Sequence, residues 1–465
     1  MHTLNTEPIR YRAYTNKNIE TLPQFQRLTS EQRAAIGAVS RVLPFRVNNY
    51  IADELIDWED IPRDPIFQLT FPQEGMLSAE DFDCMQTLLD TGAPEEQIQE
   101  TVKGIRLRMN PHPAGQMELN VPIVDGQEQP GMQHKYRETV LFFPSQGQTC
   151  HAYCTYCFRW AQFVGMDEFK FANNEASSLV KYVRTHPEVR DVLITGGDPM
   201  IMRTSVLESY IRPLLEIESL RSIRIGTKAL AWWPHRFVSD TDADDLLRLF
   251  EDVVNSGKHL AIMAHYSHPR EMAPEISQVA VRRIQATGAT IRAQAPLIRQ
   301  VNDCPDTWAA MWQKQVDMGI IPYYMFVERD TGPRRYFDVP LHRAFDIFTR
   351  AVRQVSGLGR TVRGPSMSCQ PGKVLIDGVT EINGERVFAL KFIQGRDPNW
   401  ANRMFFAKYD ESASWIDDLK PAFADRFFFD ETLSETTKWK NFAVYPGARA
   451  RAAEAGAASR KTSSQ

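Results

Sequence analysis

An alternation of short apolar runs with longer amphipathic stretches, repeated from residue 139 to residue 326, constrains the fold of this chain more than any other feature. The apolar runs have the length of buried strands, and the stretches between them have helical periodicity. Strands that alternate with helices form a parallel sheet with right-handed crossovers. We therefore expect strands at 139–143, 191–195, 222–226, 259–265, 289–294 and 321–326, and helices at 177–185, 204–218, 241–255, 271–286 and 306–318.

This pattern predicts an α/β fold whose six strands form a closed or partial (β/α)6 barrel. Before the barrel, Ser78 and Pro94 are expected to open two helices. The predicted parts are a mixed helical N-terminal extension (1–130), the barrel (131–337), a C-terminal region with one more helix, one strand and an aromatic-rich segment (338–445), and a small, polar, disordered tail (446–465).

Three cysteines, Cys150, Cys154 and Cys157, directly follow the first expected strand, where such a barrel carries its chemistry. A four-iron cluster normally takes four cysteine ligands, so three thiolates leave one iron open. That iron can chelate S-adenosylmethionine, whose reductive cleavage gives a 5'-deoxyadenosyl radical. We therefore expect a catalytic 4Fe-4S cluster. The alternatives are a zinc site, which usually takes four ligands, and a chance group of buried thiols.

Two further candidates lie at the same edge of the expected sheet. Gly196, Gly197 and Asp198 end the second strand, where glycines allow a close approach of the backbone and the carboxylate can accept from the amino group of S-adenosylmethionine. A tight turn is the alternative. Arg159 follows the last cysteine and offers a guanidinium for a substrate carboxylate, with a structural ion pair as the alternative.

Lys373 follows a Pro-Gly turn just before an expected strand, where its amine can form a Schiff base with pyridoxal phosphate. A solvated turn residue is the alternative. His265 and His268 have no third ligand nearby in the sequence, so we expect a polar contact to the nucleoside or a role in the core.

The composition excludes several classes of protein. A net charge of −4 over 465 residues gives no support for a nucleic-acid partner. The chain shows neither the apolar core of a signal peptide nor the roughly 20 apolar residues of a membrane span, so we expect a cytoplasmic protein. Six cysteines, three of them close together, indicate reduced thiols and a metal site.

Between residues 54 and 379 the chain resembles the lysine 2,3-aminomutase family of radical S-adenosylmethionine enzymes, which use pyridoxal phosphate to move an amino group between adjacent carbons. The resemblance implies an isomerase acting on a free amino acid as its small-molecule substrate, an electron donor such as flavodoxin or ferredoxin, and a homo-oligomer. It is carried by the stretches PGMQHKYRETVLFF, CHAYCTYCFR, LITGGDP, SIRIGTKA, AHYSHPRE, GATIRAQAPLIRQVNDC, IPYYMF and PGK.

The resemblance also implies roles for individual residues. Cys150, Cys154 and Cys157 would bind the cluster, Arg159 would hold the substrate carboxylate, and Lys373 would form the Schiff base. The contacts to S-adenosylmethionine would come from Gly196, Gly197, Asp198 and Gln294, and those to the cofactor phosphate from Lys135 and Tyr136.

The chain departs from the lysine-specific pattern at two positions. Arg329 and Ser366 stand where lysine-specific members have two aspartates, and a cation with a hydroxyl does not suit a buried distal ammonium. We therefore expect an acidic or other non-lysine amino acid, such as glutamate or aspartate. Lysine is the alternative if Glu328 or Asp330 takes the place of Arg329. A radical enzyme without pyridoxal phosphate, acting on a peptide or metabolite, and a noncatalytic iron–sulfur protein are further alternatives.

Two more departures concern the phosphate and zinc. A second basic residue expected for the phosphate aligns with Thr139. Cys304 matches a zinc ligand of the family, but the cysteines that would complete that site are missing, so zinc is not expected. Oligomers would then use the aromatic C-terminal segment, for which packing within the chain is the alternative: Phe427, Phe428, Phe429 and Trp439.

Overall fold

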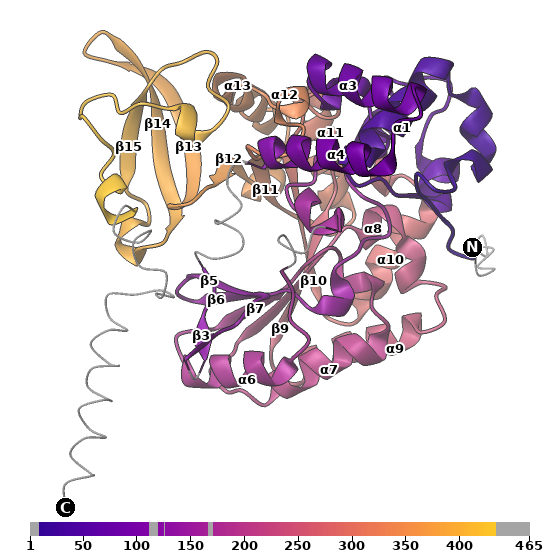
Figure 1. The fold of residues 1–465 in the computed structure, drawn as a ribbon. Helices are drawn as coiled ribbons and strands as arrows, with labels where there is room; N and C mark the ends of the chain where they lie inside the picture. Colours follow the sequence, from indigo (N-terminus) through magenta and orange to yellow (C-terminus); the bar gives the residue numbers. More distant parts are fainter. Residues whose placement is uncertain (1–8, 111–119, 125, 166–170, 434–465) are drawn as a thin grey trace, which may run out of the picture.

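The computed structural model describes residues 9–110, 120–124, 126–165 and 171–433. Its centre is an eleven-stranded sheet with the strand order β15-β14-β13-β12-β11-β10-β9-β8-β7-β6-β5, flanked by helices (Figure 1). The expected tail and Trp439 lie outside the described residues. Within them, no helix combines the length and the hydropathy that crossing a membrane requires.

The middle of the sheet is parallel and runs in sequence order, as the alternating pattern predicts. All six expected strands are present, and a seventh, β12, joins them. The parallel strands are β6 (Thr139–Phe142), β7 (Asp191–Ile194), β8 (Ser222–Thr227), β9 (His259–His265), β10 (Thr290–Leu297), β11 (Ile321–Val327) and β12 (Arg363–Ser368).

Helices follow the strands and lie along the outer side of the sheet (Figure 1). They are α6 (Ala176–Thr185), α7 (Thr204–Leu215), α8 (Ala229–Trp232), α9 (Ala243–Asn255), α10 (Glu275–Ala286), α11 (Pro305–Asp317), α12 (Arg334–Phe337) and α13 (Leu341–Val352). In β8, Ile223 and Ile225 are fully buried, whereas the alternate residues Ser222 and Arg224 are only partly buried. The alternation places polar side chains on the face opposite the apolar one.

Antiparallel strands extend the sheet at both ends. β5 (Met132–Tyr136) pairs with β6, and β13 (Gly372–Ile382), β14 (Glu385–Gly395) and β15 (Met404–Lys408) continue it beyond β12. The prediction of one strand after residue 337 was wrong, because four strands follow it: β12 and β13 where one strand was expected, and β14 and β15 in the aromatic-rich segment. The strands on either side of residue 337 therefore belong to one sheet.

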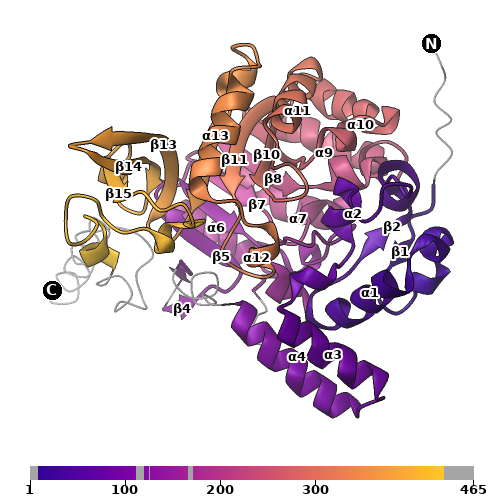
Figure 2. The same cartoon turned by 90° about the horizontal axis from the view of Figure 1, so that it is seen from above.

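The N-terminal part packs onto the same hydrophobic core as the sheet. It contains β1 (Ala13–Tyr14), β2 (Val47–Asn48), α1 (Ser30–Val42), α2 (Pro65–Thr70), α3 (Ala79–Asp90) and α4 (Glu95–Met109), and a short pair, β3 (Ile123–Val124) with β4 (Gln127–Glu128), precedes β5. The Ser78 hydroxyl caps α3 by accepting from the Asp81 N–H at 3.1 Å, as predicted. Seen from above, these helices and the β13–β15 extension lie on opposite sides of the molecule (Figure 2).

The C-terminal aromatic residues pack within the chain. Phe427 and Phe429 stack at 5.2 Å between ring centres, and both contact Phe405 of β15. Phe428 contacts Trp400 at 5.8 Å. These contacts assign the three phenylalanines to a second core under β13–β15.

Candidate active site

The cysteine loop follows β6 and is held by the N-terminal part of the chain. Cys150, Cys154 and Cys157 are free and half-buried. The Thr155 N–H donates to the Leu69 carbonyl at 3.0 Å, and the Thr155 hydroxyl donates to the Gln68 carbonyl at 2.7 Å. Segments more than 80 residues apart in the sequence therefore fix the loop.

Arg46 contacts this loop through both its side chain and its backbone, and sequence analysis missed it. Its guanidinium donates to the Thr149 hydroxyl at 2.8 Å and to the Cys150 carbonyl at 3.2 Å, and it lies 5.2 Å from the centre of the Tyr153 ring. The Arg46 carbonyl in turn accepts from the Tyr153 N–H at 2.9 Å. One residue of the extension thus holds the loop on both sides of the first cysteine.

The donors of this loop fit an iron–sulfur cluster. Burial raises the pKa of all three thiols, to about 11 for Cys157, so the loop as it stands favours neutral sulfur and would release protons on binding metal. Three sulfur donors match the three cysteine-bound irons of a cluster with one open iron. Among the described residues, no group of three or more histidine, cysteine, aspartate or glutamate side chains is placed to hold a single metal ion.

Arg159 lies beside the cysteines and is nearly fully buried, at 7% exposure. Its guanidinium donates to Gln148 Oε1 at 3.2 Å and lies 4.3 Å from the centre of the Phe143 ring, while Nε has no hydrogen-bond partner in the described structure. Burial lowers its pKa to about 10, whereas Cys157 and Cys150 raise it. A buried cation with an unused donor suits a carboxylate ligand.

The Gly-Gly-Asp turn is pressed against the same loop. A Cβ atom on Gly197 would come 2.5 Å from the Thr149 carbonyl oxygen, so only glycine fits. The Asp198 N–H donates to that carbonyl at 2.8 Å. The Asp198 carboxylate accepts from the Thr227 hydroxyl at 2.7 Å and from the N–H groups of Met200 and Lys228 at 2.9 and 2.8 Å. Asp198 thus ties β7 to β8, and its contact with S-adenosylmethionine stays a prediction.

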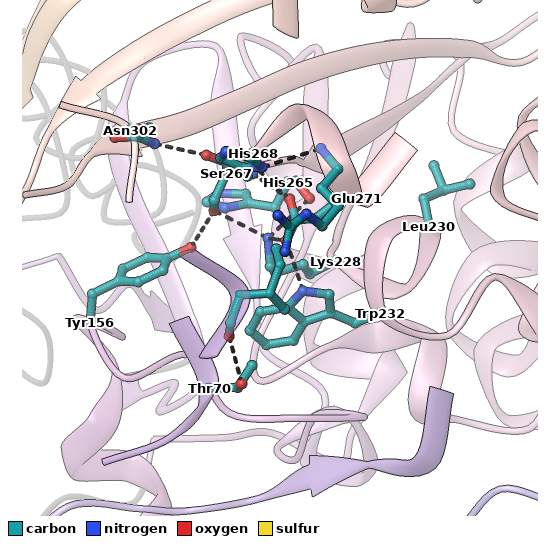
Figure 3. A network of polar contacts seen from close by, with 12 residues as sticks. Thr70, Tyr156, Lys228, Leu230, Trp232, His265, Ser267, His268, Glu271 and Asn302 are labelled. Carbon is teal, nitrogen blue, oxygen red and sulfur yellow. Dashed lines mark hydrogen bonds and ion pairs between the residues drawn. The ribbon is translucent and has the colours of Figure 1, made fainter. Parts of the chain in front are cut away.

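A buried polar network, also missed by sequence analysis, connects the ends of β8 and β9 to the cysteine loop (Figure 3). Glu271, fully buried, accepts from Lys228 Nζ and from Trp232 Nε1, each at 2.8 Å, and from the Ser267 N–H at 2.5 Å. The Tyr156 hydroxyl, between the second and third cysteines, lies 3.0 Å from Ser267 Oγ. The network therefore couples the cysteine loop to the sheet.

Lys373 is the second residue of β13, and its amine lies 4.7 Å from the centre of the Tyr324 ring. Burial lowers its pKa to about 7, and nearby Arg224 and Arg363 lower it further, while Asp191 opposes them. A lysine that is neutral near pH 7 is a nucleophile. The alternative of a solvated turn residue was wrong, because the amine is enclosed by rings and charged groups.

Asp191 occupies the first position of β7 and organises this region. It accepts from Arg224 Nε at 2.9 Å, from the Ser222 hydroxyl at 2.8 Å and from the Thr139 hydroxyl at 3.0 Å. Thr139, which aligns with an expected phosphate ligand, is thus engaged with Asp191.

Lys135 and Tyr136 lie beside the turn that precedes Lys373. Lys135 Nζ donates to the Cys369 carbonyl. The Tyr136 hydroxyl is buried without a hydrogen-bond partner among the described residues, and its ring centre lies 5.3 Å from Lys135 Nζ and 5.8 Å from Lys373 Nζ. Two amines and an unpartnered hydroxyl fit an anionic cofactor with an aldehyde group, which is the chemistry of pyridoxal phosphate.

The residues expected to meet the far end of the substrate lie directly after β11 and on β12. The Arg329 guanidinium lies 5.1 Å from the centre of the Phe158 ring, next to the cysteine loop. Ser366 is fully buried, and its hydroxyl has no partner in the described structure. Glu328 is buried, which raises its pKa to about 8.

Gln294 is half-buried on β10, in register with His265. Cys304 is exposed at the start of α11.

No protein-family model matches the chain, but individual known proteins are similar to it in sequence. A protein of Aquifex aeolicus (strain VF5) named "Putative L-lysine 2,3-aminomutase" is 30% identical over 409 residues, covering 88% of this chain and 96% of its own. L-lysine 2,3-aminomutase of Bacillus subtilis (strain 168) is 24% identical over 91% of this chain and 81% of its own, and that of Clostridium subterminale is 25% identical over 58% and 62%. The chain therefore belongs to the lysine 2,3-aminomutase family, isomerases that use a 4Fe-4S cluster, S-adenosylmethionine and pyridoxal phosphate.

Proposed function

We propose that this enzyme moves the α-amino group to the β-carbon of an amino acid other than lysine, with an acidic side chain as the best candidate. The observation that supports the proposal most strongly is the environment of Arg329. Its guanidinium lies 5.1 Å from the centre of the Phe158 ring, next to the cysteine loop, and its charge acts to lower the pKa of Lys135 and Tyr136, which lie beside the turn that precedes Lys373. A substrate ammonium there would meet a fixed positive charge, whereas a carboxylate would be attracted to it.

Ser366 supports the same choice. Its buried hydroxyl lacks a partner among the described residues, and a carboxylate oxygen can accept from it. A substrate ammonium could only donate to the oxygen of this hydroxyl, and the positive charge of the ammonium would stay without a compensating negative charge.

Lysine is the second candidate, and two observations favour it. Several relatives are named L-lysine 2,3-aminomutase. Glu328 is also buried beside Arg329 and could pair with an ammonium. However, burial raises the pKa of Glu328 to about 8, so this carboxyl is mainly neutral at pH 7.

In this proposal, different residues of the chain have different roles. When bound, the cluster and S-adenosylmethionine supply hydrogen-atom abstraction, and pyridoxal phosphate supplies an electrophilic carbon for the migrating nitrogen. Cys150, Cys154 and Cys157 hold the cluster, and Arg159 fixes the substrate carboxylate with its fork of donors. Lys373 holds the cofactor through its amine.

The six strands β6–β11 are proposed to act as a partial (β/α)6 barrel around this site. Lys135 of β5 donates to the carbonyl of Cys369, which lies between β12 and β13. Strands that are distant in the order of the sheet are thus linked by a side chain, which supports a strongly curved sheet. A flavodoxin- or ferredoxin-like donor and a homo-oligomeric state complete the proposal.

The test is anaerobic reconstitution followed by separate incubation with glutamate, aspartate and lysine, with the β-amino products separated by chromatography. We expect a β-amino acid from an acidic substrate. Arg329→Gln should lower kcat/KM for that substrate about 10- to 100-fold, the loss of one charged hydrogen bond, while cleavage of S-adenosylmethionine continues. Arg335→Gln, at an exposed arginine close in sequence, is the matched control.

Clean conversion of lysine alone would overturn the proposed specificity but leave the aminomutase activity intact. Borohydride reduction and peptide mapping address the cofactor separately. A loaded enzyme with no pyridoxyl label on Lys373 would instead favour a radical enzyme without pyridoxal phosphate.

A further inference from the structure

The turn that presents Lys373 is held from two directions. Within it, the Cys369 N–H donates to the Gly372 carbonyl at 2.9 Å, and the Gly372 N–H donates back to the Cys369 carbonyl at 3.2 Å. Its carbonyls accept from outside as well. Cys369 accepts from Lys135 Nζ, Gln370 accepts from Arg396 Nε at 3.2 Å, and Pro371 accepts from the Arg396 N–H at 2.9 Å. Three successive carbonyl groups of the turn before Lys373 thus accept hydrogen bonds from Lys135 and Arg396.

Arg396 follows the end of β14, whereas Lys135 lies in β5, at the opposite end of the sheet order. No pattern in the sequence connects the two residues. Arg396 Nε is bound to Gln370, and within the described part of the chain the two Nη groups make no hydrogen bond, so they can serve another partner.

The charges at this turn call for an anion. Burial places the pKa of Lys135 well below its usual value, and Arg396 is the charged neighbour that lowers it most. Lys373 and Arg329 act in the same direction. The carbonyl oxygens satisfy N–H groups but neutralise no charge, so burial and the neighbouring Arg396 both disfavour the charged form of Lys135. A bound dianion would remove this cost.

Tyr136 supplies a second, independent indication. Its hydroxyl is buried and unpartnered among the described residues, although a buried donor without an acceptor destabilises the fold. Its pKa is raised first by burial and then by Cys369, and Arg396 opposes the rise. An acceptor-rich group bound between Arg396 and Lys135 would also satisfy this hydroxyl.

We propose that Arg396 is the second cation that binds the phosphate of pyridoxal phosphate, in the role that Thr139 cannot fill because its hydroxyl is engaged with Asp191. Lys135, Arg396 and Tyr136 then hold the phosphate while Lys373 takes the aldehyde. The inference rests on the proposed use of pyridoxal phosphate. It adds a ligand that lies outside the stretches shared with the family.

The test compares pyridoxal phosphate with pyridoxal, which has the same aldehyde but no phosphate. Each compound is titrated into apo-protein and followed by absorbance, and the label on Lys373 is mapped after borohydride reduction. Arg396→Gln should weaken binding of pyridoxal phosphate about 10- to 100-fold and leave pyridoxal unaffected, because a charged hydrogen bond to phosphate is lost. Inorganic phosphate should compete with pyridoxal phosphate in the wild type and less in the variant.

Arg386→Gln is the matched control. Arg386 lies on β14 as well, but its guanidinium stacks on the Tyr409 ring at 3.8 Å, so neither compound should bind differently. Unchanged binding of pyridoxal phosphate to Arg396→Gln would overturn the inference. Equal loss of both compounds would also overturn it, because Arg396 would then only support the turn. A wild-type protein that takes up neither compound would instead refute the proposed cofactor.

Discussion

The amine of Lys373 should titrate near neutral pH. Its pKa is lowered from 10.5 to about 7, chiefly by burial and then by Arg224 and Arg363. At pH 7 about half of the amines are then neutral, against about one in 3000 for a pKa of 10.5, a difference of more than a thousandfold. Because the neutral amine is the nucleophile, the rate of pyridoxal phosphate capture should follow this fraction.

The same shift affects stability. Between pH 7 and pH 10.5 the unfolded chain binds more protons at this lysine than the folded chain does, so the free energy of unfolding should rise with pH across that window. The full effect is at most about 4–5 kcal/mol from 1.36 kcal/mol per pH unit. Lys373→Met isolates it, since the variant should lose that part of the pH dependence.

The assay mixes apo-protein with pyridoxal phosphate between pH 5.5 and pH 9.5 and stops the reaction with borohydride. We expect a sigmoidal rate profile with its midpoint near pH 7. Arg224→Gln should move the midpoint up and Asp191→Asn should move it down, because these residues act on Lys373 with opposite signs. A rate that climbs tenfold per pH unit up to pH 9.5 would refute the reasoning, because it would describe an ordinary lysine.

Two further predictions concern the support of the cysteine loop. Glu271→Gln should lower the free energy of unfolding of the apo-protein by about 3–5 kcal/mol, measured with denaturant, because it leaves the Lys228 charge buried and unpaired. Exposed Glu275→Gln should change little, and equal stability of both variants would contradict the argument. Arg46→Gln should retain less iron and sulfide per chain after reconstitution and desalting, whereas exposed Arg12→Gln should match the wild type. Full retention in Arg46→Gln would show that this arginine does not secure the loop.

The parallel strands could be predicted because the face of each strand that packs against the helices is buried. Such strands appear in the sequence as short apolar runs, and β9 begins and ends where the pattern predicts. The β13–β14 hairpin was missed, although the sequence carries a signal for it. Asn383 and Gly384 both have positive φ, at 52° and 81°, the geometry that Asn-Gly favours in a two-residue hairpin turn.

The residues of the candidate site also include some that the sequence indicates and some that it does not. The cysteines could be proposed from their spacing within a short motif, and Lys373 could be proposed from the resemblance to the family. Arg46, Glu271 and Arg396 could not, because each acts through contacts made by the tertiary fold. Arg46 binds a loop more than 100 residues away, and Arg396 reaches a turn 26 residues before it. In a sequence they are ordinary charged residues.

Substrate choice depends on a feature that no alignment contains. Glu328 and Arg329 are adjacent, so a shift of one residue in the alignment would exchange them. Both residues follow the end of β11 at Val327, so the alternation of side chains along a strand does not decide where they point. Glu328 acts on the pKa of Cys157, whereas Arg329 acts on that of Lys135 and stacks on Phe158. In the proposed function, a distal carboxylate would meet the Arg329 cation, whereas a distal ammonium would need Glu328 ionised, which burial opposes. The proposal of an acidic substrate therefore rests on burial as well as on residue identity.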